Sequence, residues 1–85
     1  MILIKKRSRF DEIVCIDLTN AYAIEISKKI LRIIYPNSEF YVVELKTELS
    51  DEQREQLAYY LSVMKNKEEV INFEKVLETI GGKDD

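Results

Sequence analysis

The 85-residue sequence predicts a small α+β domain with the element order β-β-α-β-α-α, in which a three-stranded mixed sheet carries its helices mainly on one face. Three observations support this prediction: a strand–helix–strand pattern between residues 12 and 46, two helix-start signals after it, and a chain with only two glycines and one proline. Because glycine and proline interrupt regular elements, their scarcity indicates long elements and short connections. We expect one globular domain over residues 1–82 and a frayed C-terminal tail over residues 83–85.

The first two elements are expected to be strands joined by a polar turn. Residues 1–5 form a short apolar run and residues 6–11 are mostly polar, so the segment 12–18 should pair antiparallel with the first strand. Successive side chains of a strand point to opposite faces. In the segment 12–18 both faces are apolar; one carries Val14, Ile16 and Leu18, and the other carries Ile13 and Cys15. This pattern is typical of a central strand, in which Cys15 would be packed as a small hydrophobic residue.

Residues 20–35 are predicted to form a helix. A polar stripe at the spacing i, i+3, i+4 and i+7 consists of Glu25, Lys28, Lys29 and Arg32. The remaining directions are apolar over an arc of roughly 220°, much wider than a surface helix needs. The helix should end at Tyr35, because Pro36 disfavours helical geometry in the residue before it. With its two flanking strands this helix would form a right-handed βαβ unit with parallel strands.

A third strand and two further helices should complete the fold. The segment 39–46 alternates between two rows of side chains, one of which contains Tyr41, Val43 and Leu45. Ser50 and Gln53 match a capping box, which predicts a helix start. A break is expected near residues 65–66, followed by a last helix that ends at Gly81–Gly82; a single bent helix over residues 51–80 is the alternative. The inward positions of the two helices are expected to be Leu57, Tyr60, Leu61 and Met64 in the first, and Val70, Phe73, Val76, Leu77 and Ile80 in the second.

The composition favours an intracellular protein that needs no cofactor. Cys15 is the only cysteine, so no internal disulfide can form and a reducing, cytoplasmic location is expected. No apolar run approaches the ~20 residues that span a bilayer, so no membrane association is expected. The chain has no histidine, which is the commonest general base and metal ligand. We therefore expect no catalytic residues, no metal site and no cofactor.

One carboxylate is nevertheless a candidate site. Asp17 lies at the carboxyl end of a strand that leads into the predicted helix, and this is the edge where open α/β sheets bind ligands. It could hold a metal ion or polarise a substrate, with Asn20 or Glu44 as neighbours. The simpler interpretation is that Asp17 accepts hydrogen bonds from the amides of Thr19 and Asn20 in a turn, or that it caps the predicted helix.

Two clusters of charge suggest macromolecular partners. A basic cluster near the N-terminus could bind nucleic-acid phosphates, or it could be a solvated turn that protects a sheet edge. An acidic set could present a phosphate-like surface to a basic partner, or it could simply favour a helix start. The basic cluster consists of Lys5, Lys6, Arg7 and Arg9, and the acidic set consists of Glu48, Asp51, Glu52 and Glu55.

The leading functional hypothesis is a small non-enzymatic protein that binds another protein as a regulator or inhibitor, such as one encoded by a virus or another mobile element. The wide apolar surface of the predicted helix also favours a homodimer. Candidate interface residues are Tyr22, Ile24, Leu31, Tyr35 and Tyr59. A nucleic-acid-associated protein that uses the basic cluster is the alternative, and a small enzyme or metal site centred on Asp17 is the third possibility.

Overall fold

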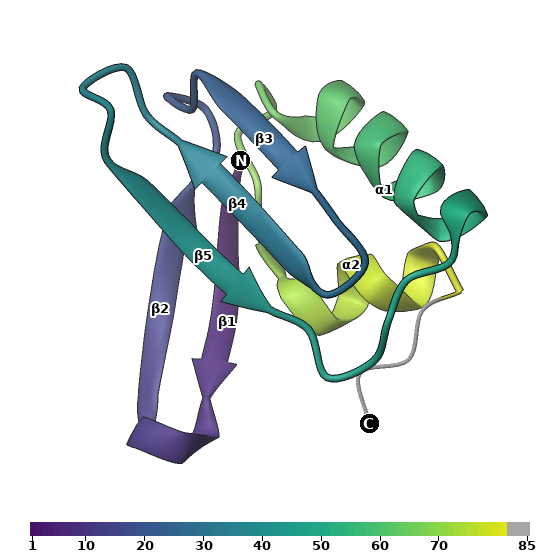
Figure 1. Ribbon diagram of the computed structural model, residues 1–85. Coiled ribbons are helices and arrows are strands. Elements are labelled where there is room, and N and C mark those ends of the chain that lie inside the picture. The colour runs from purple at the N-terminus through teal and green to yellow at the C-terminus, as the bar shows by residue number, and fades with distance from the viewer. Residues whose placement is uncertain (82–85) are drawn as a thin grey trace.

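The computed structural model describes residues 1–81 and contains two β-sheets and two α-helices, with one short 3₁₀ turn (Figure 1). The first sheet has the strand order β2-β1-β6, and the second has the order β3-β4-β5. The elements in chain order are β1 (Ile2–Arg7), η1 (Ser8–Phe10), β2 (Glu12–Asp17), β3 (Ala23–Ile26), β4 (Ile30–Ile34), β5 (Phe40–Glu44), α1 (Asp51–Met64), β6 (Val70–Asn72) and α2 (Phe73–Thr79). The α+β class is confirmed, whereas the single sheet and the order β-β-α-β-α-α are wrong. The predicted tail over residues 83–85 lies outside the described residues.

The first sheet is mixed. β1 pairs antiparallel with β2, as expected from the polar turn between them, and it pairs parallel with the short strand β6. β2 is therefore an edge strand rather than the predicted central one, and its Cys15 is exposed instead of packed in the core. The second sheet is antiparallel throughout. In Figure 1, β1 and β2 run steeply behind the oblique strands of the second sheet, so the two sheets cross.

The predicted helix over residues 20–35 is wrong, because this segment folds as the hairpin of β3 and β4. Isoleucine dominates the segment, and its β-branched side chain favours strands. The supposed helical stripe has a different origin in the hairpin. Glu25 and Arg32 are direct cross-strand partners, while Lys28 and Lys29 lie in the turn between them. The right-handed βαβ unit is consequently wrong as well, and β2 and β5 belong to different sheets.

The two helices contribute buried side chains to the same core as the inner faces of the two sheets. α1 runs beside β3, and α2 packs against β1 and β6 (Figure 1). The capping box of α1 is present: the Gln53 N–H donates to the Ser50 hydroxyl at 3.1 Å, and the Gln53 side chain accepts from the Ser50 N–H at 2.9 Å. α1 ends at Met64, so the predicted break is confirmed and the single bent helix is wrong. Gly81 has a φ of 76°, the left-handed conformation expected where a helix terminates.

Apolar side chains from all of these elements meet in one core. The largest fully buried members are Leu3, Leu18, Leu31, Ile33, Leu57, Leu61, Phe73 and Val76. The inward positions predicted for the helices are buried or half-buried except Val70, which lies in β6 and is exposed. The alternation of β5 is also as expected, since Val43 is buried and Tyr41 half-buried while Phe40 and Val42 are exposed.

The amino end of the chain is part of this core. The Met1 side chain is buried, and its ammonium group donates hydrogen bonds to the Thr19 hydroxyl at 2.8 Å and to the carbonyl oxygen of Lys65 at 3.0 Å. Lys65 is the C-terminal cap of α1, where unpaired carbonyl groups create a negative potential. A positive charge at this point therefore stabilises the end of α1.

Candidate functional site

The outer face of the second sheet is the best-formed candidate site. Strand register places Ala23, Ile34 and Phe40 in one row across β3, β4 and β5, and Glu25, Arg32 and Val42 in the next row. Residues on this face are mostly exposed or half-buried, whereas the residues between them point into the core. Phe40 is 59% exposed, and the neighbouring Tyr22 is 77% exposed. Two aromatic rings therefore flank an apolar sheet surface that neither helix covers.

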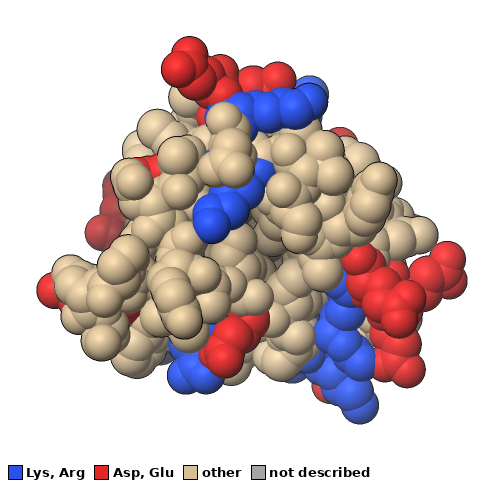
Figure 2. Space-filling view, turned by 90° about the horizontal axis from the view of Figure 1, so that it is seen from above, with Lys and Arg blue, Asp and Glu red and all other residues tan. Residues whose placement is uncertain are grey.

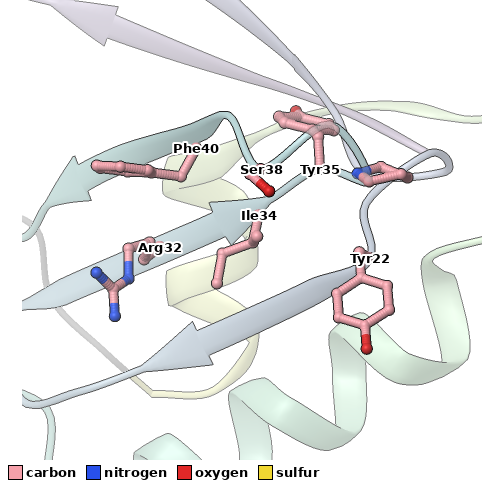
Figure 3. Close-up of a pocket in the computed structure, with 7 residues that line it drawn as sticks. Tyr22, Arg32, Ile34, Tyr35, Ser38 and Phe40 are labelled. Carbon is pink, nitrogen blue, oxygen red and sulfur yellow. The ribbon is translucent and has the colours of Figure 1, made fainter.

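A hollow of about 360 Å³ opens on this face (Figure 3). Figure 3 shows Phe40 above the sheet on one side, Ile34 on the floor and Tyr22 at the far edge of β3. A second hollow of about 400 Å³ shares Arg32 with the first and extends along Ile30 and Val42. The full lining of the first hollow is Tyr22, Arg32, Ile34, Tyr35, Pro36, Ser38 and Phe40. We call this set, together with Ile30 and Val42, the β3–β5 face.

Arg32 is the main polar group of the β3–β5 face. Its Nε donates to Glu25 Oε1 at 2.5 Å, and its Nη2 forms an ion pair with the same oxygen. The guanidinium carbon also lies 5.7 Å from the centroid of the Phe40 ring, within cation–π range. Both members of the ion pair are about half exposed, so the pair contributes little to stability. Its effect is to hold the guanidinium between the two hollows.

Tyr35 connects this face to the first sheet. Its hydroxyl donates a hydrogen bond of 2.9 Å to the backbone carbonyl of Asp17 at the end of β2. Burial raises the pKa of the Tyr35 phenol, and the negative charge of Asp17 raises it further. The phenol therefore stays protonated at neutral pH and remains a donor.

Asp17 lies in the turn that the simpler interpretation predicts. Its Oδ1 accepts from the backbone N–H of Thr19 at 3.0 Å, and its Oδ2 accepts from the side-chain amide of Asn20 at 2.6 Å. Glu44, the other suggested neighbour, belongs to the far end of β5 in the second sheet. Among the described residues, no group of three or more His, Cys, Asp or Glu side chains could hold a metal ion.

The predicted interface residues are separated by the hairpin. Tyr22 and Tyr35 line the first hollow, but Ile24 is half-buried toward the core and Leu31 is fully buried. Tyr59 is exposed on α1. Sequence reasoning missed Ile34, Arg32 and Phe40 as parts of one surface. The signal was present, because apolar side chains occupy both faces of the segments 30–34 and 40–44.

The basic cluster does not form one patch. Lys5 and Lys6 point to opposite faces of β1, and the Lys5 ammonium lies 5.3 Å from the ring centroid of Phe73 on the core side. Arg7 forms an ion pair with Glu12 at 2.8 Å. The guanidinium carbons of Arg7 and Arg9 lie 4.5 and 5.9 Å from the ring centroid of Phe10 at the tip of the β1–β2 hairpin.

The acidic set is exposed around the start of α1, and Asp51 forms an ion pair with Arg54. Glu52 accepts a hydrogen bond of 3.4 Å from Gln56, while Glu48 and Glu55 are exposed. The view from above in Figure 2 shows both signs of charge scattered over a mostly uncharged surface, without a field of one sign. Over residues 1–81, no helix is long and apolar enough to cross a membrane. Comparison of the chain with protein-family models, with curated proteins and with solved structures finds no match.

Proposed function

We propose that this chain is a non-enzymatic protein-binding module, with a regulatory or inhibitory role, that binds its partner through the β3–β5 face. One observation supports the proposal most strongly. Phe40, Val42 and Tyr22 are exposed around two hollows on the outer face of the second sheet, which neither helix covers. Exposed apolar patches of this kind are typical of protein interaction sites. Aromatic residues and arginine are also the residue types that contribute most to binding free energy.

The chemistry of the β3–β5 face defines the group that the partner should present. Apolar walls around Ile34 and Phe40 favour an aliphatic or aromatic side chain that fills the first hollow. Arg32 carries five N–H donors, more than the single carboxylate of Glu25 satisfies, so the partner should place a carbonyl or carboxylate oxygen beside it. The partner segment is therefore an apolar side chain next to an oxygen acceptor.

A nucleic-acid partner is the second candidate, and the stack of Arg7 and Arg9 on Phe10 favours it. Aromatic rings and arginine side chains bind single-stranded bases by stacking. Two observations weigh against this candidate. Arg7 is already paired with Glu12, and Lys5 and Lys6 lie on opposite faces of the strand, so few charges converge on one backbone.

A pair of matched photo-crosslinking probes tests the two candidates together. Phe40 is 59% exposed and Phe10 is 58% exposed, and each ring stacks on an arginine. We would replace each in turn by p-benzoylphenylalanine and irradiate the protein in its native cells. The proposal expects a discrete protein adduct from position 40 that position 10 does not give. That adduct should disappear with Val42→Lys and persist with Val63→Lys, a matched change on the exposed side of α1.

The other outcomes are equally informative. A nucleic-acid adduct from position 10 with none from position 40 would support the second candidate and contradict the first. An adduct from position 40 that survives Val42→Lys would show that the probe reports collision rather than the β3–β5 face. An adduct between two copies of this chain at position 40 would make the second copy the occupant, which contradicts the proposal of a separate partner.

A further inference from the structure

The outer face of the first sheet is a second exposed apolar surface, and it is unrelated to the β3–β5 face. Register places Val70, Ile2 and Asp17 in one row across β6, β1 and β2, then Asn72, Ile4 and Cys15, then Lys6 and Ile13. Ile13 is 64% exposed and Val70 is 63% exposed. Cys15 is exposed as well, while Ile4 is half-buried. We call these eight residues the β1–β2 face.

The charges of the β1–β2 face are arranged in a self-complementary way. Asp17 stands in the first row and Lys6 stands in the last, with the apolar Ile4 and Cys15 between them. A two-fold axis that lies in the plane of the face, across the strands at the level of Ile4 and Cys15, exchanges the first row for the last. Lys6 of one copy then lies over Ile2 of the other, beside its Asp17. Each copy thus brings its positive end to the negative end of the other, and no like charges meet.

We propose that a second copy of this chain packs face to face on the β1–β2 face to form a two-fold symmetric dimer. Such an interface is isologous, so the same residues meet their counterparts from both sides. Two sheets packed face to face lie ~10 Å apart, and side chains from both interdigitate. Ile2, Ile4 and Ile13 supply the apolar contact, and the two pairs of Lys6 with Asp17 fix the register of the sheets rather than adding much affinity.

This arrangement explains why an edge strand carries apolar side chains on both of its faces. Val14 and Ile16 point toward the core, and Ile13 and Cys15 point outward. A β-sheet with one face in water normally alternates apolar and polar residues. The outward row of β2 therefore has the composition of a covered surface, while α2 lies on the other side of this sheet, where its Phe73 ring faces the Lys5 ammonium.

Sedimentation equilibrium of the full chain, from about 1 μM to about 1 mM, tests the proposal. The wild-type protein should shift from monomer to dimer over this range. Ile13→Glu should raise the dimer dissociation constant about tenfold or more, because it would place a carboxylate directly over Asp17 of the other copy. Lys6→Glu should also weaken the dimer, whereas Lys75→Glu, the same charge change on α2, should leave it unchanged. Val42→Lys, on the β3–β5 face, should leave it unchanged as well, so failure of the proposed function is separable from failure of this inference.

The single cysteine distinguishes face-to-face packing from pairing of two β2 edges. In the proposed dimer the two Cys15 residues lie near the axis on sheets ~10 Å apart, beyond the ~7 Å between Cα atoms that a disulfide allows. A short bismaleimide should therefore link two chains. Diamide, which takes up the two electrons and two protons released when two thiols join, should not. Edge-to-edge pairing would bring the cysteine Cα atoms to ~5.5 Å and give a disulfide with diamide.

Several results would overturn the proposal. A protein that stays monomeric up to about 1 mM has no such dimer. A dimer that Val42→Lys disrupts and Ile13→Glu does not would use the other sheet. Rapid formation of a Cys15 disulfide with diamide would show edge pairing instead of face-to-face packing. Circular dichroism of each variant would confirm that the fold is retained, which is expected because Ile13, Lys6 and Val42 are exposed.

Discussion

Replacing Leu31 by alanine tests the placement of the β3–β4 hairpin. As part of a helix over residues 20–35, Leu31 and Tyr22 would both belong to an interaction surface. In the structure Leu31 is 0% exposed and Tyr22 is 77% exposed. A fully buried leucine changed to alanine loses about 2–5 kcal/mol, which includes the cost of the cavity left behind. An exposed residue such as Tyr22 changed to alanine costs about 0.5 kcal/mol or less.

The expected loss is large compared with the whole stability of the fold. At 0.05–0.15 kcal/mol per residue, this chain should unfold with a free energy of roughly 4–13 kcal/mol. At the middle of both ranges, Leu31→Ala should therefore remove about 40% of the stability, and it should lower the melting temperature by about 10–30 °C. Urea unfolding followed by circular dichroism measures both variants, at a protein concentration where the chain is monomeric so that association adds nothing. Equal destabilisation by Leu31→Ala and Tyr22→Ala would refute the hairpin placement.

Three further predictions concern the cap, the phenol and the thiol. Ser50→Ala should lower the free energy of unfolding by about 1 kcal/mol, because the capping box loses its acceptor; unfolding that is unchanged in urea would contradict the cap. The raised pKa of Tyr35 stabilises the fold below the ordinary pKa of 10.0, and this contribution is lost as the pH rises through the folded-state pKa. As the pH rises from 10.0 through the folded-state pKa, the melting temperature of the wild type should therefore fall more steeply than that of Tyr35→Phe. Parallel pH profiles of the two proteins would contradict the assignment. Cys15 should react with a thiol reagent in the native state at nearly the rate of an unfolded control, and protection of the monomer would show that the thiol is buried.

Local signals determined which elements could be predicted from the sequence. The capping box at Ser50, the polar turn after residue 5 and the strict alternation of β5 each act over a few neighbouring residues, so they could be recognised without the fold. The hairpin could not be recognised in this way. Glu25 and Arg32 are seven residues apart, a spacing that suits two turns of helix and equally suits two strands around a short turn. Only pairing with β5 decides between them, and that pairing is a tertiary contact.

The candidate site shows the same division. Tyr22 and Tyr35 were among the candidate interface residues, and both line the first hollow. Phe40 and Arg32 were assigned to separate elements with separate purposes, because their neighbourhood depends on the register between β4 and β5. Cys15 was misplaced for a related reason. A strand that is apolar on both faces is normally central, and the sequence contains no sign that this one lies at an edge.

The anchored ammonium group of Met1 has a practical consequence for every experiment described above. Its nitrogen already contacts Thr19 and Lys65, and its side chain fills part of the interior, so a peptide fused before Met1 would have to leave through that crowded corner. Affinity handles, dyes and surface tethers joined to the α-amino nitrogen would remove its charge and disturb its hydrogen bonds to Thr19 and Lys65. Attachment to the solvent side of α1, for example at an engineered residue replacing Ser62 or Val63, avoids this distortion.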